Sequence, residues 1–267
     1  MNYSISNLSW NFEDSEAYKI LKNNSISLLE ISLTRQFESW HNIDSKKIIN
    51  FKNKISNEHG LAVCSLQSIF YKKRINIFDN NYEVLEHFKK IINFADLLQC
   101  KYLVFGSPSI RKTRGKSMSE CDDIFLSLFE KIAEINPEIT IGIETNPPCY
   151  GNEYLTTHRE CANILNKLAK NNVCFHLDTS CVFLGGEDIF DIYNREKNVL
   201  KHIHISAPNL GLVTEEQKNK LFLNYISNKN NNNNVTLSIE MLNKKKVELD
   251  MAIKFVKENA ECQIKTR

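Results

Sequence analysis

Residues 140–178 read TIGIETNPPCYGNEYLTTHRECANILNKLAKNNVCFHLD and contain one complete strand–helix–strand unit. Apolar runs at Thr140–Glu144 and Val173–Asp178 predict two strands. Between them, Cys161–Ala169 repeats its apolar residues with the period of one helix face, and Thr157 opens a segment with the form of a capping box, THRE. Because strand and helix alternate strictly, we expect the two strands to be parallel.

The same alternation extends along all 267 residues. Helical periodicity marks Tyr82–Leu98, Ile124–Ile135 and the region of Met251 and Phe255, and Asp44 can cap a further helix. The predicted strands are Tyr3–Leu8, Ser27–Ile31, Ala62–Gln67, Tyr102–Phe105, Thr140–Glu144, Val173–Asp178, His202–Ile205 and Thr236–Glu240. Eight such units predict an α/β fold, a single (β/α)8 TIM barrel that occupies residues 1–267 as one domain. The rival, an open doubly wound sheet, lacks its glycine-rich first turn, since no GxGxxG occurs.

Composition narrows the class of protein. Lys and Arg number 34 against 32 Asp and Glu, and this near-neutral balance argues against a nucleic-acid partner. We expect no membrane span, because no apolar stretch approaches about 18 residues, and the first residues do not have the form of a secretory signal. The 8 cysteines form no CxxC pair, so we expect free thiols in a reducing cytoplasm rather than a zinc ribbon.

Polar side chains stand at the carboxyl ends of the last four predicted strands. IGIE ends at Glu144, FHLD at Asp178 and LSIE at Glu240, and His204 lies in HIHIS. Active-site residues of such barrels gather at this end of the strands, and neighbouring strands bring these four side chains together. Three carboxylates and an imidazole suit Mn²⁺, Mg²⁺, Co²⁺ or Zn²⁺, and without a cation or proton the carboxylates would repel one another. The sequence therefore predicts a metal site here.

Other side chains near these strand ends are candidates for a supporting role. His176 and His202 lie two residues before Asp178 and His204, so each shares a face with its neighbour one layer deeper and is interpreted as a supporting or packing histidine. Cys181 follows the sixth strand and can be a soft ligand or a wall of the pocket. The hard character of the other ligands favours a wall.

A basic loop, Ser107–Ser119, follows the fourth predicted strand. We expect it to open on the catalytic face, where its cations either clamp a phosphate or carboxylate or are simply solvated. Arg35, shortly after the second strand, is another candidate for binding an anion. The five asparagines 230–234 are expected to form an exposed loop tip without function. The cations of the basic loop are Arg111, Lys112, Arg114 and Lys116.

Short motifs occur in a specific order over nearly the whole chain. They are ISNLSW, LLEIS with LTR, SLQSIF, LVFGSP, IGIETNPPCYGNEYLTT, FHLDTS, HIHIS and LSIEM. In this order and spacing the chain resembles the sugar phosphate isomerase/epimerase family, within the xylose-isomerase-like barrel superfamily. The resemblance implies one divalent metal ion, Mn, Mg, Co or Zn, held by Glu144, Asp178, His204 and Glu240.

The resemblance also implies an activity in carbohydrate metabolism. Glu144 and Glu240 would flank the substrate carbon and exchange its proton through an enediolate, in a metal-dependent isomerase: a sugar epimerase or an aldose–ketose isomerase. A small sugar or sugar phosphate is the expected partner, with neither nucleic acid nor membrane, and the formation of a homodimer is left open. The expected substrate contacts are Arg35, Gln67, Ser107, Arg111, His176, Cys181 and His202.

Departures from the family pattern bear on the substrate rather than on the metal site. Cys181 stands where many epimerase relatives carry a histidine, and Ala207 stands where many carry a glutamate. An arginine common after that glutamate is missing, with Leu210 and Gly211 in the region. Two alternatives stay open: a metal-dependent hydrolase or lyase acting on a phosphoester or modified sugar, and a sugar-binding barrel without catalysis.

Overall fold

Eight parallel strands close into a barrel in the order β1 to β8, and β8 pairs with β1. The structure is a computed structural model that describes residues 1–229 and 235–261, so the asparagine run lies outside the described residues. The strands are β1 (Asn2–Ser6), β2 (Leu28–Ser32), β3 (Ala62–Gln67), β4 (Tyr102–Phe105), β5 (Thr140–Glu144), β6 (Val173–Asp178), β7 (His202–Ser206) and β8 (Thr236–Glu240). The predicted (β/α)8 TIM barrel is confirmed. Five strands have the predicted bounds, and β1, β2 and β7 differ by at most two residues at an end.

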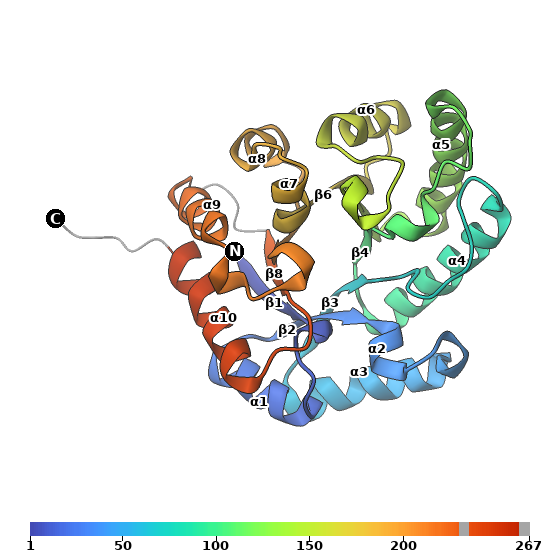
Figure 1. The fold of residues 1–267 in the computed structure, drawn as a ribbon. Coiled ribbons are helices and arrows are strands. Elements are labelled where there is room, and N and C mark those ends of the chain that lie inside the picture. The colour runs from blue at the N-terminus through green and yellow to red at the C-terminus, as the bar shows by residue number, and fades with distance from the viewer. Residues whose placement is uncertain (230–234, 262–267) are drawn as a thin grey trace.

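The helices form a ring around the barrel, as Figure 1 shows. Two short helices, α2 and α7, come directly after the strands β2 and β6 and precede a longer helix in the same connection. The helices are α1 (Asp14–Asn23), α2 (Leu33–Phe37), α3 (Ser45–His59), α4 (Asn81–Leu98), α5 (Met118–Ile135), α6 (His158–Leu168), α7 (Thr179–Leu184), α8 (Ile189–Glu196), α9 (Gln217–Asn228) and α10 (Lys246–Ala260).

Side-chain caps decide where several helices begin. Thr157 and Glu160 form the predicted capping box at the start of α6, and the Asp44 side chain caps α3. A second capping box, between Ser117 and Glu120, starts α5 six residues before the predicted Ile124. The basic loop therefore ends at Ser117, because the first turn of this helix is held by its cap rather than by apolar packing.

The core has two layers of different chemistry. Between strands and helices it is apolar: for example, the rings of Phe88 and Phe129 lie 5.6 Å and 5.1 Å from that of Phe105. Inside the barrel, where bulky aliphatic residues usually fill the space, buried polar residues such as Glu30 and His202 occur instead. Buried polar groups must be hydrogen-bonded, so the barrel interior is held by a polar network.

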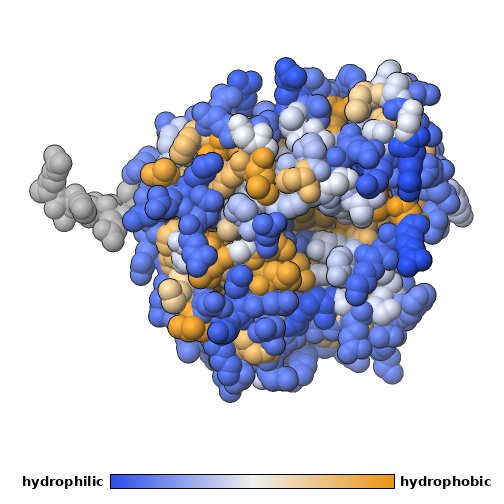
Figure 2. Space-filling model, viewed as in Figure 1, coloured by the Kyte–Doolittle hydropathy of each residue, from blue (hydrophilic) through white to orange (hydrophobic). Residues whose placement is uncertain are grey.

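Polar residues cover most of the molecular face in Figure 2, with apolar residues exposed between them nearer the middle.

None of the helices in residues 1–229 and 235–261 combines the length and the apolarity that crossing a bilayer requires. The cysteines of the described residues are all free.

Candidate metal centre

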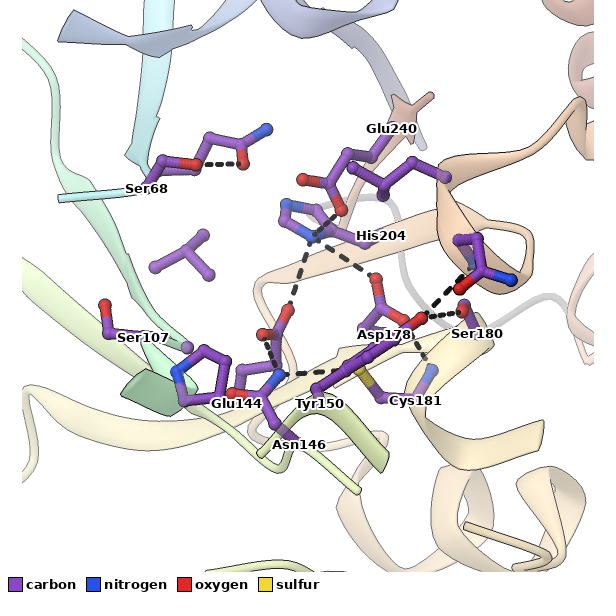
Figure 3. A pocket seen from close by; sticks show the side chains of 16 residues that line it. Ser68, Ser107, Glu144, Asn146, Tyr150, Asp178, Ser180, Cys181, His204 and Glu240 are labelled. Carbon is purple, nitrogen blue, oxygen red and sulfur yellow. Dashed lines mark hydrogen bonds and ion pairs between the residues drawn. The ribbon is translucent and has the colours of Figure 1, made fainter. Parts of the chain in front are cut away.

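Four side chains from consecutive strands meet at the carboxyl end of the barrel. His204 Nδ1 lies 3.2 Å from Glu240 Oε2, 3.6 Å from Asp178 Oδ2 and 3.6 Å from Glu144 Oε1. Figure 3 shows the three carboxylates pointing toward the His204 ring. All four residues are at least nine-tenths buried. The parallel register places the ends of β5 to β8 side by side, and this is why residues spread over 97 positions converge.

The donor set fits a divalent cation. His204 Nδ1 is buried and makes no hydrogen bond to any described residue, although carboxylate oxygens surround it. Ligand atoms of Asp178, His204 and Glu240 all lie within 4.8 Å of one another. Three carboxylates and one imidazole nitrogen are ligands that Mg²⁺, Mn²⁺ or Zn²⁺ accepts. A cation in their midst would satisfy the nitrogen and offset the repulsion between the carboxylates.

The charges of the site are strongly coupled. Burial, together with the neighbouring Asp178 and Glu144 carboxylates, raises the pKa of Glu240 to about 7 against the opposing effect of His204. Burial by itself would lower the pKa of His204, but the carboxylates of Glu30 and Glu240 hold it well above its usual value. Protons therefore occupy part of this cluster when a metal does not.

Asn146 and Arg111 support Glu144 from behind. Asn146 Nδ2 donates a 2.6 Å hydrogen bond to Glu144 Oε2, and Asn146 Oδ1 accepts one from Arg111 Nη2. Arg111 is completely buried and lies over the Phe105 ring, 5.6 Å from its centroid. Burial lowers the pKa of Arg111 to about 10, so the guanidinium stays charged at neutral pH. Sequence reasoning missed Asn146, which shares a strand-end face with Glu144 by the two-residue alternation.

A layer of polar residues lies beneath the four side chains, inside the barrel. His204 Nε2 and His202 Nε2 both contact the Glu30 carboxylate from β2, at 2.9 Å each. His176 lies beside them, 3.9 Å from Glu144 Oε1, and its Nδ1 is hydrogen-bonded to the Tyr102 hydroxyl at 3.2 Å. His176 and His202 thus occupy the deeper layer expected for them. Glu30 was not among the expected site residues, although a lone carboxylate within LLEIS was the available signal.

A cavity of about 440 Å³ opens above the four side chains. Of the residues expected to contact substrate, Gln67, Ser107 and Cys181 line this cavity. Burial and the nearby Asp178 and Glu144 carboxylates raise the pKa of the Cys181 thiol well above its usual value, so it stays protonated and fits a wall better than a soft ligand.

The cavity wall includes four residues with left-handed backbone. Ser68, Ser107, Asn209 and Leu210 have φ of 52°, 49°, 57° and 54°, and none is a glycine. Such conformations cost roughly 1–2 kcal/mol per residue. All four residues line the cavity, and Figure 3 shows Ser68 and Ser107 on the side away from Asp178.

The two arginines expected to bind an anion do not line the cavity. Arg111 turns inward, because its guanidinium finds Asn146 and the Phe105 ring there. Arg35 pairs with Asp14 over 2.6 Å. Of the sixteen described residues that line the cavity, none is a lysine or an arginine. The expectation of a basic clamp over the site therefore has no support in this geometry.

Residues 25–213 match the family of xylose isomerase-like TIM barrels. The chain belongs to this family. The comparison with curated proteins gives no match. Among solved structures, this xylose isomerase-like barrel is similar to a D-tagatose 3-epimerase-like protein. That protein has a TM-score of 0.76 and 16% identity, over 97% of each chain.

Two further structures illustrate how varied the activities on this barrel are. D-psicose 3-epimerase from Clostridium cellulolyticum H10, solved with D-tagatose, has a TM-score of 0.72 and 13% identity, over 98% of this chain and 100% of the other. An AP endonuclease, family 2, from Brucella melitensis has a TM-score of 0.71 and 16% identity, over 95% and 98%. At such low identity the likeness establishes the fold and leaves the reaction to be argued from the site.

Proposed function

We propose that this protein is a divalent-metal-dependent isomerase or epimerase that acts on an unphosphorylated sugar. The observation that carries the proposal is the convergence of three carboxylates on His204 Nδ1 at the floor of the cavity. Glu144, Asp178, His204 and Glu240 would hold the cation. A divalent cation held there supplies Lewis-acid polarisation of a carbonyl oxygen.

In the proposed reaction the two glutamates move the protons. Glu144 on β5 and Glu240 on β8 approach the cavity from different sides of His204 (Figure 3). One carboxylate removes the proton from the carbon next to the carbonyl, and the other returns a proton to the opposite face for epimerisation or to the neighbouring carbon for isomerisation. The raised pKa of Glu240, about 7, suits a group that must both take and give a proton near neutral pH.

The cavity chemistry supports a neutral substrate. Besides His204 and Cys181, its polar lining consists of amides, hydroxyls and acids, such as Gln67, Asn146 and Ser180, and the cations of the basic loop do not line it. For example, Arg114 pairs with Asp79 over 3.3 Å. A phosphate placed beside three carboxylates without a basic partner would be repelled, whereas sugar hydroxyls can hydrogen-bond to these groups.

The test is proton exchange in D₂O. Protein stripped of metal and reloaded with Mn²⁺, Mg²⁺, Co²⁺ or Zn²⁺ is incubated with a panel of free aldoses and ketoses and with their phosphates, and NMR follows deuterium entry. We expect metal-dependent exchange into a free sugar. Release of phosphate would instead establish a hydrolase, and binding without exchange or cleavage would establish a sugar-binding barrel.

A further inference from the structure

We propose that Glu30 is a positioning residue that keeps a proton on His204 Nε2 and thereby presents Nδ1 to the metal centre. The inference rests on the proposed metal-dependent function, because it assigns a task to a residue one layer below the four ligands. Glu30 comes from β2, across the barrel from β7, and does not line the cavity. It is thus outside the substrate site and acts through His204.

The carboxylate of Glu30 is enclosed by donors. It is completely buried, and it accepts hydrogen bonds from Ser65 Oγ at 2.7 Å, Gln67 Nε2 at 3.0 Å and Ser238 Oγ at 3.2 Å. The imidazole of His202 approaches it at 2.9 Å. Three strands besides β2 therefore send polar side chains to this one group: β3 through Ser65 and Gln67, β7 through its two histidines, and β8 through Ser238.

An ionised carboxylate only accepts hydrogen bonds. His204 Nε2 lies 2.9 Å from Glu30 Oε1 and 3.0 Å from Oε2, so this nitrogen must carry a proton and donate it. The other ring nitrogen, Nδ1, is the one that faces Glu144, Asp178 and Glu240. With the proton held on Nε2, the neutral ring has its lone pair on Nδ1, which is the form that ligates a metal.

A neutral amide at position 30 would not impose this choice. Glutamine can turn its NH₂ group toward His204 Nε2 and donate to it, which favours the tautomer with the proton on Nδ1. In that tautomer the N–H points at the three carboxylates and no lone pair is available to a cation. Glutamine is nearly the same size as glutamate, so Glu30→Gln tests the position of the proton on the His204 ring rather than the packing around residue 30.

The first experiment uses the wild-type protein loaded with Zn²⁺ alone. In ¹⁵N NMR of the histidine side chains, we expect His204 Nε2 to be protonated, with a one-bond coupling to its hydrogen, and Nδ1 to be metal-bound. A His204 that binds Zn²⁺ through Nε2, or that carries no proton there, would overturn the inference without any variant.

The second experiment compares Zn²⁺ dissociation constants, measured by competition with a chromophoric chelator. We expect Glu30→Gln to weaken Zn²⁺ binding by about 10–100-fold, as loss of an orienting carboxylate does at other metal sites. The matched control is Ser4→Ala, which alters a buried residue of β1 whose hydroxyl makes no hydrogen bond to Glu30. The Zn²⁺ dissociation constant of Ser4→Ala should stay near the wild-type value.

The outcomes separate the two claims. If the wild-type protein does not bind Zn²⁺, the proposed metal-dependent function fails. If it binds Zn²⁺ through His204 Nδ1 but Glu30→Gln binds equally well, the metal centre stands and the role of Glu30 is overturned. Should Glu30→Gln not fold, the NMR spectrum of the wild-type protein still decides the question.

Discussion

The side-chain amide of Asn146 donates a 2.6 Å hydrogen bond to Glu144 Oε2 while its oxygen accepts from the buried Arg111. The amide is therefore fixed in one orientation, because an exchange of its oxygen and nitrogen would set a donor against the guanidinium and an acceptor against the carboxylate. This link orients Glu144, which we propose as a metal ligand and proton carrier. Each of its members can be tested separately.

Asn146→Ala should keep the fold and reduce turnover by about 10–100-fold, because the carboxylate of Glu144 loses the donor that orients it. The measurement is the rate of deuterium exchange together with the Zn²⁺ dissociation constant. Asn172→Ala is the matched control, since the Asn172 amide donates to the backbone oxygens of Ala133 and Ile139. Turnover within about twofold of wild type in Asn146→Ala would mean that Glu144 needs no such support.

Arg111→Met should lower turnover on neutral and phosphorylated sugars by the same factor, because Arg111 contacts Asn146 rather than the cavity. We also expect the free energy of unfolding to fall by about 1–3 kcal/mol, since Asn146 Oδ1 loses its buried partner. Urea unfolding and parallel kinetics on both substrate types give the two values. The control, Arg114→Met, changes a half-exposed arginine of the same loop. A loss of turnover confined to phosphorylated sugars would instead support the hypothesis that Arg111 binds the anion of the substrate.

Gly106→Ala should impair the metal centre while the barrel stays folded. A Cβ at this position would overlap Glu144 Oε2 and lie 3.2 Å from its Cδ, so the carboxylate must move away from its partners. A displacement of about 1 Å at a reacting group can cost roughly 100-fold in rate. Gly185→Ala is the comparison, because its Cβ would lie 3.2 Å or more from its neighbours. Normal Zn²⁺ affinity and turnover in Gly106→Ala would show that Glu144 has another productive position.

Glu240→Gln should abolish turnover and yet stabilise the metal-free protein above pH 7. Turnover should fall by about 10²–10⁴-fold, because the amide can neither take nor give the proton. The folded pKa of Glu240, about 7, lies above its unfolded value near 4.5. Its contribution to stability is therefore full below pH 4.5 and is lost as the pH rises through 7.

The measurement for Glu240→Gln is thermal unfolding of metal-free protein at pH 5 and pH 8, next to the deuterium-exchange rate. Glu138→Gln, which alters an exposed glutamate, should match wild type in both. A Glu240→Gln protein that turns over sugar within a few-fold of wild type would show that Glu240 is structural. Equal pH dependence of stability would show that its carboxyl group ionises normally.

His87→Gln should make the protein less sensitive to acid. His87 Nε2 donates to the Ile69 carbonyl over 2.7 Å, and burial lowers its pKa to about 4. Between pH 6.5 and 4 the unfolded chain takes up a proton that the folded chain refuses, so the wild-type protein loses about 3 kcal/mol over that range. Glutamine can keep the hydrogen bond without titrating. Urea unfolding at pH 7 and pH 4.5 measures the difference, and His41→Gln is the exposed control. Parallel stability losses in His87→Gln and wild type would contradict the assignment.

The strand ends were predictable because short apolar runs alternate with segments of helical periodicity along the chain. Apolar runs give β5 and β6 their bounds, and the parallel arrangement then forces Glu144 and Asp178 together. The inward turn of Arg111 could not be read from the sequence, because four cations within one short loop look alike until Phe105 and Asn146 provide a site for one of them. The partner of His204 was likewise hidden, since Glu30 lies 174 residues away in the chain.

The left-handed backbone at Ser68, Ser107, Asn209 and Leu210 sets stability against function in this barrel. Glycine at any of these positions would relieve roughly 1 kcal/mol of strain. It would also remove a side chain from the cavity wall. Directed evolution that selects for thermal stability alone should therefore accumulate glycines at these positions. The resulting proteins would be more stable, but their cavities would be wider and less selective for substrate. Laboratories that engineer this scaffold would need to screen thermal tolerance and substrate discrimination together.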